Sequence, residues 1–340
     1  MKRWLPMLLL VLAGAALLLF PNEATQGAAY GLALSARSVI PALFPFLVLS
    51  KCAVPYLDAL PRGAWAETGM RRLFGVSGNC LSPLLLSFCG GYPCGVAAMT
   101  EVFRQGGVSK REAERALCFC NNSGPAFFLA VLGGTVLGRV KAGFALYCIH
   151  VLSAILTGIY LSEPLKLTIH PISRKNAPHF GSLFVESITE SCRTILEISA
   201  FVVFFSVVAE VLRRVLPPLA LPYLTHAETE GLIFGILELS SGSLRLAGTP
   251  HAFVLCAFLM GWGGLCVHFQ AMRFWHSAGL APKGYFSHKL LHGLLSAFFA
   301  ALWLHPTPPY VLMGLIFFLI GAFFPVIRKK RAGNLRRAAL

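Results

Sequence analysis

Residues 79–100 read NCLSPLLLSFCGGYPCGVAAMT, an apolar stretch that GGYPCG interrupts at positions 90–95. A simple membrane anchor would carry leucine or another helix former there. An unpaired backbone N–H or C=O costs several kcal/mol in hydrocarbon. Broken backbone at membrane depth therefore persists only where protein or a water-filled cavity covers it. The stretch predicts a broken, re-entrant hairpin rather than a plain span.

Three further interruptions follow the same pattern. NNSGP at 121–125 lies inside the apolar stretch 116–138, and the second half contains ELSSG at 238–242 and GWGG at 261–264. Paired broken segments in the two halves of a chain are the strongest sequence indication of a transporter's substrate site.

The composition identifies a polytopic membrane protein. The chain has 340 residues, of which 56% are hydrophobic and 13% charged, and its mean hydropathy is +0.70. Soluble domains carry about 25% charged residues. The net charge of +15 includes six basic residues between positions 328 and 337, directly after an apolar stretch. Such a cluster is typical of a cytoplasmic tail near anionic lipid, so we expect the bilayer and no nucleic acid as a partner.

Catalytic and metal-binding motifs are not found. The ten cysteines lie almost wholly in apolar segments without a CxxC pair, and the sequence contains no GxxxxGK[ST], HExxH or GxSxG. His288 and His292 share a helix face, but two histidines alone are weak evidence for a metal, and the neighbouring Lys289 indicates an interfacial position. We therefore expect no enzyme, no metal site and no cofactor, and leave open H⁺ or Na⁺ as a coupling ion.

The apolar pattern predicts an all-α fold of about eight spanning helices plus two re-entrant or broken hairpins, with both termini cytoplasmic. Residues 4–20 fit a first span better than a signal peptide because the apolar stretch is long and no small-x-small cleavage site follows at once. The expected spans are 4–20, 28–57, 116–138, 142–163, 183–212, 251–270, 287–304 and 309–327, and the expected hairpins are 79–100 and 230–247. This topology keeps most Lys and Arg residues, including those of 101–115, on the inside.

The two halves share a pattern. SARS at 35–38 and SCRT at 191–194 open long apolar stretches 156 residues apart, and Ser50 and Ser206 share that offset. Each long stretch precedes a hairpin candidate. The expected topology inverts the second repeat relative to the first, an arrangement that places a substrate site at the midplane.

Arg37 and Arg193 are the candidate cations. Two guanidiniums could clamp a dicarboxylate through paired hydrogen bonds, or each could snorkel to its own membrane face. Glu238, beside Ser241 at a break, is the candidate for a coupling ion, with an ion pair to Arg245 as the alternative. Glu197 fits an i,i+4 ion pair with Arg193.

Polar and aromatic groups at the breaks complete the candidate site. Asn121, Asn122 and Ser123 supply amide and hydroxyl groups where free helix N–H groups would attract an anion, although they could merely satisfy backbone freed by Gly124 and Pro125. Tyr92, Trp262, His268 and Gln270 are candidate stacking or hydrogen-bonding partners of an aromatic ligand, with packing as the plain alternative.

Six motifs in chain order resemble one family. They are VIPALFPF at 39–46, GYPCG at 91–95, FCNNSGP at 119–125, FFSV at 204–207, Gly235 with Glu238 and Gly242, and Gly263-Gly264 with Val267, His268 and Gln270. Together they resemble the YlbJ-type sporulation integral membrane proteins of the nucleoside-recognition, or Gate, superfamily, over roughly residues 30–300. The chain departs from the family pattern at Cys94, Cys120 and Asn122, which leaves the cargo open.

The resemblance implies two Gate-like repeats and a relation to concentrative nucleoside transporters. The repeats would occupy 28–163 and 183–304, with an N-terminal helix at 1–27, a cytoplasmic linker at 164–182, and a last helix with the basic tail at 305–340. It also implies a role in endospore formation, moving dipicolinic acid, a flat aromatic dianion, across the outer forespore membrane.

Substrate-binding residues follow from the motifs and the charges together. We expect them to be Arg37, Tyr92, Asn121, Asn122, Ser123, Arg193, Glu238, Ser241, His268 and Gln270. The expected activity is alternating-access transport of a small organic anion. A nucleoside transporter and a non-transporting membrane scaffold for spore assembly stay open as alternatives, as does association with itself or with other sporulation membrane proteins.

Overall fold

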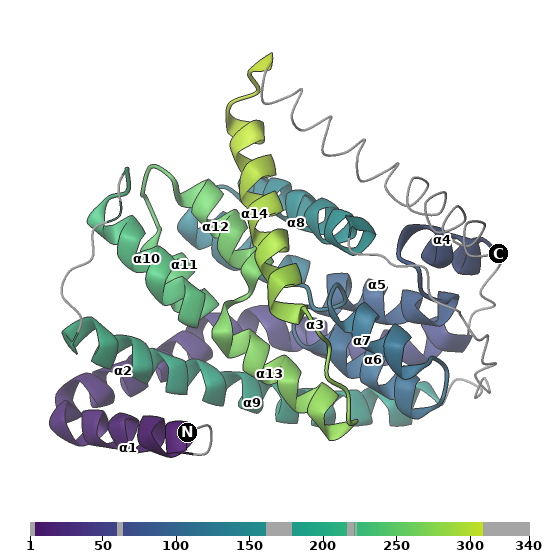
Figure 1. Ribbon diagram of the computed structural model, residues 1–340, viewed down its shortest axis with the longest axis horizontal. Helices are drawn as coiled ribbons and strands as arrows, with labels where there is room; N and C mark the ends of the chain where they lie inside the picture. The colour runs from purple at the N-terminus through teal and green to yellow at the C-terminus, as the bar shows by residue number, and fades with distance from the viewer. Residues whose placement is uncertain (1–3, 60–63, 161–178, 216–220, 222, 309–340) are drawn as a thin grey trace, which may run out of the picture.

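The computed structural model describes residues 4–59, 64–160, 179–215, 221 and 223–308, and every regular element in this part of the chain is a helix (Figure 1). The first half contains α1 (Trp4–Leu19), α2 (Pro21–Leu34), the π-helix η1 (Ser35–Val39), α3 (Ile40–Ala59), α4 (Ala64–Leu73), the short 3₁₀ turn η2 (Gly78–Cys80), α5 (Leu81–Gly90), α6 (Cys94–Arg104), α7 (Lys110–Leu117), the π-helix η3 (Phe127–Val136) and α8 (Val140–Tyr160). The second half contains α9 (Phe180–Val215), α10 (His226–Leu237), α11 (Leu239–Arg245), α12 (Ala252–Trp262), α13 (Gly264–Ser277) and α14 (Tyr285–Leu304).

Four helical segments of the described chain are long and apolar enough to cross a membrane. They are 21–53, 140–160, 180–215 and 252–277, and each overlaps a predicted span. A fifth is counted if α4 and the bent segment 78–90, which meet at 88°, form one broken span. The polytopic membrane class is therefore supported, whereas the count of eight spans and the inverted relation of the halves stay predictions.

The predicted spans at the two ends of the chain are matched less closely. Helix α1 coincides with 4–20, but its 16 residues rise only about 24 Å, less than a bilayer core of about 30 Å. Helix α14 coincides with 287–304 but includes His288, Lys289 and His292 and is not among the candidate spans. The span 309–327, the basic tail and most of the linker 164–182 lie outside the described residues.

The predicted span 116–138 is interrupted, as its NNSGP sequence at 121–125 indicates, and it is not a single helix. Helix α7 ends at Leu117, residues 119–124 form no helix, and η3 begins at Phe127. Pro125 lacks an N–H and disfavours helical backbone at the preceding residue, and Gly124 adds flexibility, so helical structure resumes only at Pro125. The chain is therefore broken at the predicted interruption, as it is at 90–95.

Both predicted hairpins form as pairs of packed helices. Helices α5 and α6 pack against each other across the break at 91–93, and α10 packs against α11 across Glu238. The second pair is held by glycine: a Cβ on Gly242 would lie 2.1 Å from the Gly235 Cα. The two backbones therefore touch without intervening side chains.

Two short amphipathic helices, α4 and α7, lie beside the first hairpin in the chain. Helix α7 starts at a capping box formed by SKRE at 109–112. The Ser109 backbone N–H donates to the Glu112 carboxylate at 3.1 Å, and the Glu112 N–H donates to the Ser109 hydroxyl at 3.4 Å. Glu112 also accepts from the Ser77 N–H at 3.1 Å and is fully buried.

The long helices form a platform on which the hairpins rest. Helices α2 and α3 pack along α9, which runs across the lower part of the view in Figure 1, above α1. A Cβ on Gly27 or Gly31 would lie 2.7 Å from a Cα of α9, so α2 and α9 are in close backbone contact. Helix α14 packs against α12 and α8 in the middle of the molecule, beside the second hairpin (Figure 1).

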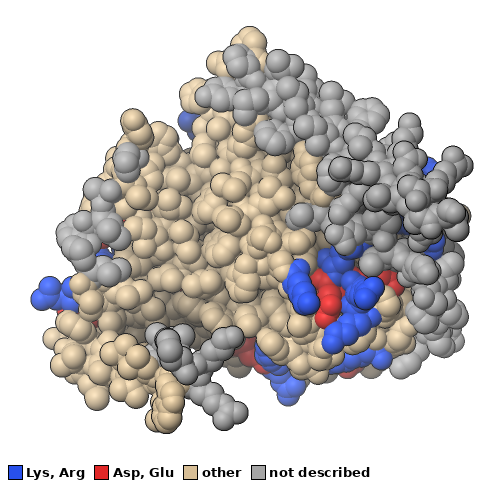
Figure 2. Space-filling view, viewed as in Figure 1, with Lys and Arg blue, Asp and Glu red and all other residues tan. Residues whose placement is uncertain are grey.

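The surface has the character of a membrane protein. Large apolar side chains are exposed on α1 and α9, among them Trp4, Leu18, Leu196 and Phe204. In Figure 2, charged side chains gather over α6 and α7, while a broad area across the centre of the same face carries none. This separation of charged and apolar surface is what a bilayer requires.

Candidate functional site

The four interruptions seen in the sequence meet in space. A Cβ on Gly91 would lie 2.7 Å from the Gly124 N, and a Cβ on Gly264 would lie 3.1 Å from the Leu239 N. The breaks therefore touch in pairs, one pair in each half. Gly91 and Gly264 have φ values of 74° and 76°, a left-handed conformation that glycine adopts without steric cost.

Tyr92 joins the two pairs of breaks. Its hydroxyl donates to the Met260 carbonyl at 2.8 Å and lies 3.3 Å from the Cβ that Gly263 would carry. Met260 is in the last turn of α12, where carbonyl groups have no partner within the helix. The first hairpin thus satisfies backbone freed by the break in the second half.

Lys289 of α14 is buried where the breaks meet, with 1% of its surface exposed. Its Nζ donates to the Asn121 carbonyl at 2.8 Å, lies 3.3 Å from His292 Nδ1, and is 5.5 Å from the centre of the Tyr92 ring. Among the described residues, no carboxylate lies within ion-pair distance of this amine. A buried amine without an acidic partner is expensive and marks a functional site.

Two histidines extend the contacts of Lys289 to α8. His292 Nε2 lies 3.0 Å from the His150 carbonyl oxygen, and the two rings are 4.5 Å apart. The Ser123 backbone N–H donates to His150 Nε2 at 3.1 Å. Because that nitrogen accepts, a neutral His150 carries its hydrogen on Nδ1, which has no partner in the described structure.

Tyr285 and His268 form the other side of the cluster. The Asn121 amide donates to the Tyr285 hydroxyl, which in turn lies 3.3 Å from His268 Nδ1. Since the tyrosine oxygen accepts from Asn121, its own hydrogen is directed to His268 Nδ1. A neutral His268 then carries its hydrogen on Nε2, which has no partner in the described part of the chain. Trp262 packs edge-on against His268 with ring centres 4.5 Å apart.

We call Tyr92, Asn121, His150, His268, Tyr285, Lys289 and His292 the Lys289 cluster. It contains one amine, which has hydrogen-bond partners but no carboxylate partner in the described chain. The His150 Nδ1–H, the His268 Nε2–H and the Asn121 Oδ1 have no hydrogen-bond partner there. Buried polar atoms without a partner are rare in native proteins. Donors and a cation gathered at broken helices can bind an anion. The cluster is covered on all sides in this structure, since each member is at most 8% exposed.

Asn122 and Ser123 hold the irregular segment 118–125 in place through hydrogen bonds to residues other than Lys289. The Asn122 amide donates to the Ser87 hydroxyl at 2.9 Å and to the Phe119 carbonyl at 2.8 Å. Ser123 contributes its backbone N–H to His150. These contacts tie the irregular segment 118–125 to α5 and α8.

Glu238 caps the second hairpin. Its carboxylate is buried and accepts from the backbone N–H groups of Ser240 at 2.9 Å and Ser241 at 2.6 Å, at the N-terminus of α11. A carboxylate at this position satisfies free N–H groups and faces the positive end of the helix. The end of the helix that could attract an anion is therefore occupied by the chain's own carboxylate.

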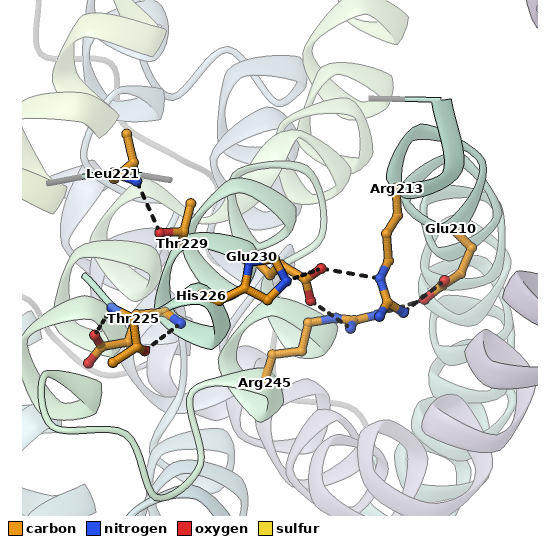
Figure 3. Close-up of polar contacts among 9 residues, drawn as sticks. Glu210, Arg213, Leu221, Thr225, His226, Thr229, Glu230 and Arg245 are labelled. Atoms are coloured by element: carbon orange, nitrogen blue, oxygen red, sulfur yellow. Dashed lines mark hydrogen bonds and ion pairs between the residues drawn. The ribbon is translucent and has the colours of Figure 1, made fainter. Parts of the chain in front are cut away.

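Arg245 pairs with other residues than Glu238, so the predicted alternative of a Glu238–Arg245 ion pair is wrong. Arg245 Nη2 lies 2.6 Å from Glu210 and its Nη1 lies 3.7 Å from Glu230. Arg213 reaches Glu230 at 3.2 Å, and His226 lies 3.4 Å from the same carboxylate (Figure 3). This network fastens the second hairpin to the end of α9.

Three other predicted site residues lie apart from the Lys289 cluster. Arg37 on η1 and Arg193 on α9 are exposed. Gln270 is buried, donates to the Cys266 Sγ at 3.3 Å, and lines a small pocket with Pro93, Thr194 and Phe274. Glu197, which borders this pocket, pairs with Arg273 instead of the predicted Arg193.

Sequence reasoning missed Lys289, Tyr285, His150 and the role of His292. Lys289 was predicted to be interfacial and was given no role in the site, but its side chain is buried among protein side chains. The signal was present: a lysine three residues from a histidine inside a predicted span is rare and usually functional. Of the predicted residues, the structure brings Tyr92, Asn121 and His268 into the cluster, with Ser123 beside it.

Comparison with known proteins agrees with the membrane class. The chain is 24% identical over 325 residues to the sporulation integral membrane protein YlbJ of Bacillus subtilis, an alignment covering 84% of this chain and 79% of that protein. No family model matches the chain, and no solved structure matches it significantly. The similarity confirms the resemblance predicted from the six motifs: the chain is similar along most of its length to a YlbJ-type sporulation integral membrane protein.

Proposed function

We propose that the protein transports a small organic anion across a bacterial membrane during endospore formation, with Lys289 as the cation that binds it. The observation that carries this proposal is the buried Lys289 amine, which has no carboxylate partner among the described residues and lies where the four helix breaks meet. The similarity to a sporulation integral membrane protein supports the biological setting.

The chemistry of the cluster favours an anion over a neutral ligand. A buried ammonium is stabilised by an opposite charge, and a carboxylate would also accept from the unpartnered N–H groups of His150 and His268. The rings of Tyr92 and Trp262 border the same region and suit a flat aromatic molecule. Dipicolinate combines a flat ring with two carboxylates, and we propose it as the cargo, moved across the outer forespore membrane.

The broken helices supply the means of opening. The cluster is closed in this structure, so an anion reaches it only when a hairpin moves relative to the platform of α2, α3 and α9. The break at 91–93, inside the first hairpin, and the break at Gly263, between α12 and α13 beside the second hairpin, allow such motion. The helices on the two sides of each break share no continuous hydrogen-bond ladder. Alternate opening of the two hairpins would expose the site first to one side of the membrane and then to the other.

Uptake of labelled dipicolinate into proteoliposomes tests the proposal, with uridine as competitor. We expect saturable uptake that uridine does not reduce, and a loss of at least tenfold in Lys289→Met, which removes the charge but keeps a side chain of similar length. Lys283→Met is the matched control, since Lys283 is exposed six residues before Lys289.

The other possible results of the uptake experiment distinguish the alternative functions. Uptake that uridine blocks would favour a nucleoside-type carrier. The absence of uptake by correctly inserted wild-type protein would contradict transport and favour a membrane scaffold. Equal uptake by Lys289→Met and the wild type would remove Lys289 from the site.

A further inference from the structure

Two basic nitrogens, Lys289 Nζ and His292 Nδ1, face each other, and in this contact one of them must accept a hydrogen bond from the other. His292 Nε2 lies 3.0 Å from the His150 carbonyl oxygen, which can only accept, so Nε2 carries a hydrogen. His292 Nδ1 is left facing the Lys289 Nζ at 3.3 Å. A neutral Lys289 amine can donate one of its own hydrogens to this nitrogen. A proton added to the pair gives either an ammonium that donates to His292 Nδ1 or an imidazolium that donates to the neutral amine.

The pair therefore holds one added proton, not two. With both groups charged, two hydrogens would point at each other across 3.3 Å, and two positive charges would repel at short range. Lys289 and His292 then gain and lose their proton as a coupled unit.

The other groups around the Lys289–His292 pair are uncharged or already engaged in hydrogen bonds, so the pair is the group that can take up a proton. Lys289 contacts the Asn121 carbonyl of the segment 118–125 and the Tyr92 ring of the segment 91–93. On α8 the pair faces His150, whose Nε2 already accepts a hydrogen bond from the Ser123 N–H. Helix α12 presents no charged side chain. From α13, His268 is engaged by the Tyr285 hydroxyl. No carboxylate of the described chain lies within ion-pair distance to hold the added charge.

We propose that each organic anion enters the site together with one proton, which binds the Lys289–His292 pair, so that transport is anion–proton symport. This rests on the proposed function. A proton adds to the lone pair of the Lys289 amine and gives an ammonium, and the anion supplies the missing counter-charge. Each charge lowers the cost of burying the other, so the proton and the anion bind cooperatively, and they leave together on the other side.

Linkage gives the size of the effect. If one proton is taken up with each anion, the apparent Kd rises about tenfold for each pH unit in the range where the empty site is unprotonated. The probe is dipicolinate, whose two carboxylates stay ionised through this range, so a change in affinity reports on the protein.

Two binding measurements on the purified full-length protein test the proposal. In the first, the dipicolinate Kd is measured from pH 7 to pH 9 for the wild type and for Lys289→Arg, whose charge is permanent. We expect a rise of about tenfold per pH unit for the wild type and a flat line for the variant. In the second, calorimetry in two buffers of different ionisation enthalpy gives the number of protons taken up by the wild type, which we expect to be about one per anion.

The outcomes separate this inference from the proposed function. Saturable binding with a pH-independent Kd and no proton uptake would overturn symport and leave the anion site intact. A wild-type slope that persists unchanged in Lys289→Arg would place the proton elsewhere and overturn the assignment to the pair. Failure of the wild type to bind dipicolinate at any pH would overturn both. Because the calorimetric test uses only the wild type, it stands even if the variant misfolds.

Discussion

Glu228 illustrates how one buried side chain can hold a helix start in place. Its carboxylate accepts from the Thr225 N–H at 2.8 Å and the His251 N–H at 2.7 Å, while its own N–H donates to the Thr225 hydroxyl at 3.2 Å. Burial of the carboxyl raises its pKa, but these N–H groups favour the charged form and lower the pKa from its usual 4.5 to about 2. Glu228 thus joins the first turn of α10 to the start of α12.

The shifted pKa predicts a pH dependence of stability. A carboxyl whose pKa is lower in the folded state contributes stability above its unfolded pKa of about 4.5 and loses that contribution as the pH falls towards 2. We expect Glu228→Gln to lower the free energy of unfolding at pH 7 by about 2 kcal/mol, as for a lost charge-assisted hydrogen bond. Between pH 5 and pH 3 its melting temperature should fall less steeply than that of the wild type. Parallel melting curves for the two proteins would contradict this role.

Residues at the site differ in how far the sequence could predict them. Tyr92, Asn121 and His268 were expected because each lies in or beside an interruption, a local feature that can be read directly. Lys289 and His150 were missed because they lie in continuous helices, and only the packing of α14 against α8 and α12 brings them to the breaks. Arg37 and Arg193 looked like site residues from their matched spacing, but spacing along a helix does not decide which face is buried.

The hairpins are elements built on close backbone contact. Gly242 and Gly235 touch across the α10–α11 pair, as Gly95 touches the Cys120 carbonyl beside the first hairpin. The sequence predicted where these helices break, because glycine, proline and asparagine act locally. The break inside 116–138 was predicted in the same way, although apolar composition alone does not distinguish a continuous spanning helix from a buried broken one.

Glycine contact in the second hairpin gives a direct test at this scale. Gly242→Ala places a Cβ 2.1 Å from the Gly235 Cα, so the helices must separate, and we expect a loss of about 2 kcal/mol. Gly69→Ala in α4 is the matched control, because nothing lies within 4 Å of its added Cβ. The control should be neutral or stabilising by up to about 1 kcal/mol. Thermal unfolding in detergent compares the two, and equal melting temperatures would show that the hairpin tolerates separation.

At the scale of the molecule, the four breaks converge on one closed polar centre. Composition and hydropathy predicted the membrane class, and the motifs predicted the similarity to a sporulation membrane protein. The convergence depends on contacts between segments up to 168 residues apart, such as that of Lys289 with Asn121, which no local pattern encodes. The platform of α2, α3 and α9 carries both hairpins, and α14 brings the cation between them.

The most direct test of the central claim is equilibrium binding of dipicolinate to the purified protein and to Lys289→Met, with Lys283→Met as the control. We expect the wild type and the control to bind one dipicolinate per chain with the same Kd, and Lys289→Met to bind at least tenfold more weakly because the buried cation is gone. If Lys289→Met, folded as judged by its melting temperature, binds dipicolinate as tightly as the wild type does, the anion site is not at Lys289.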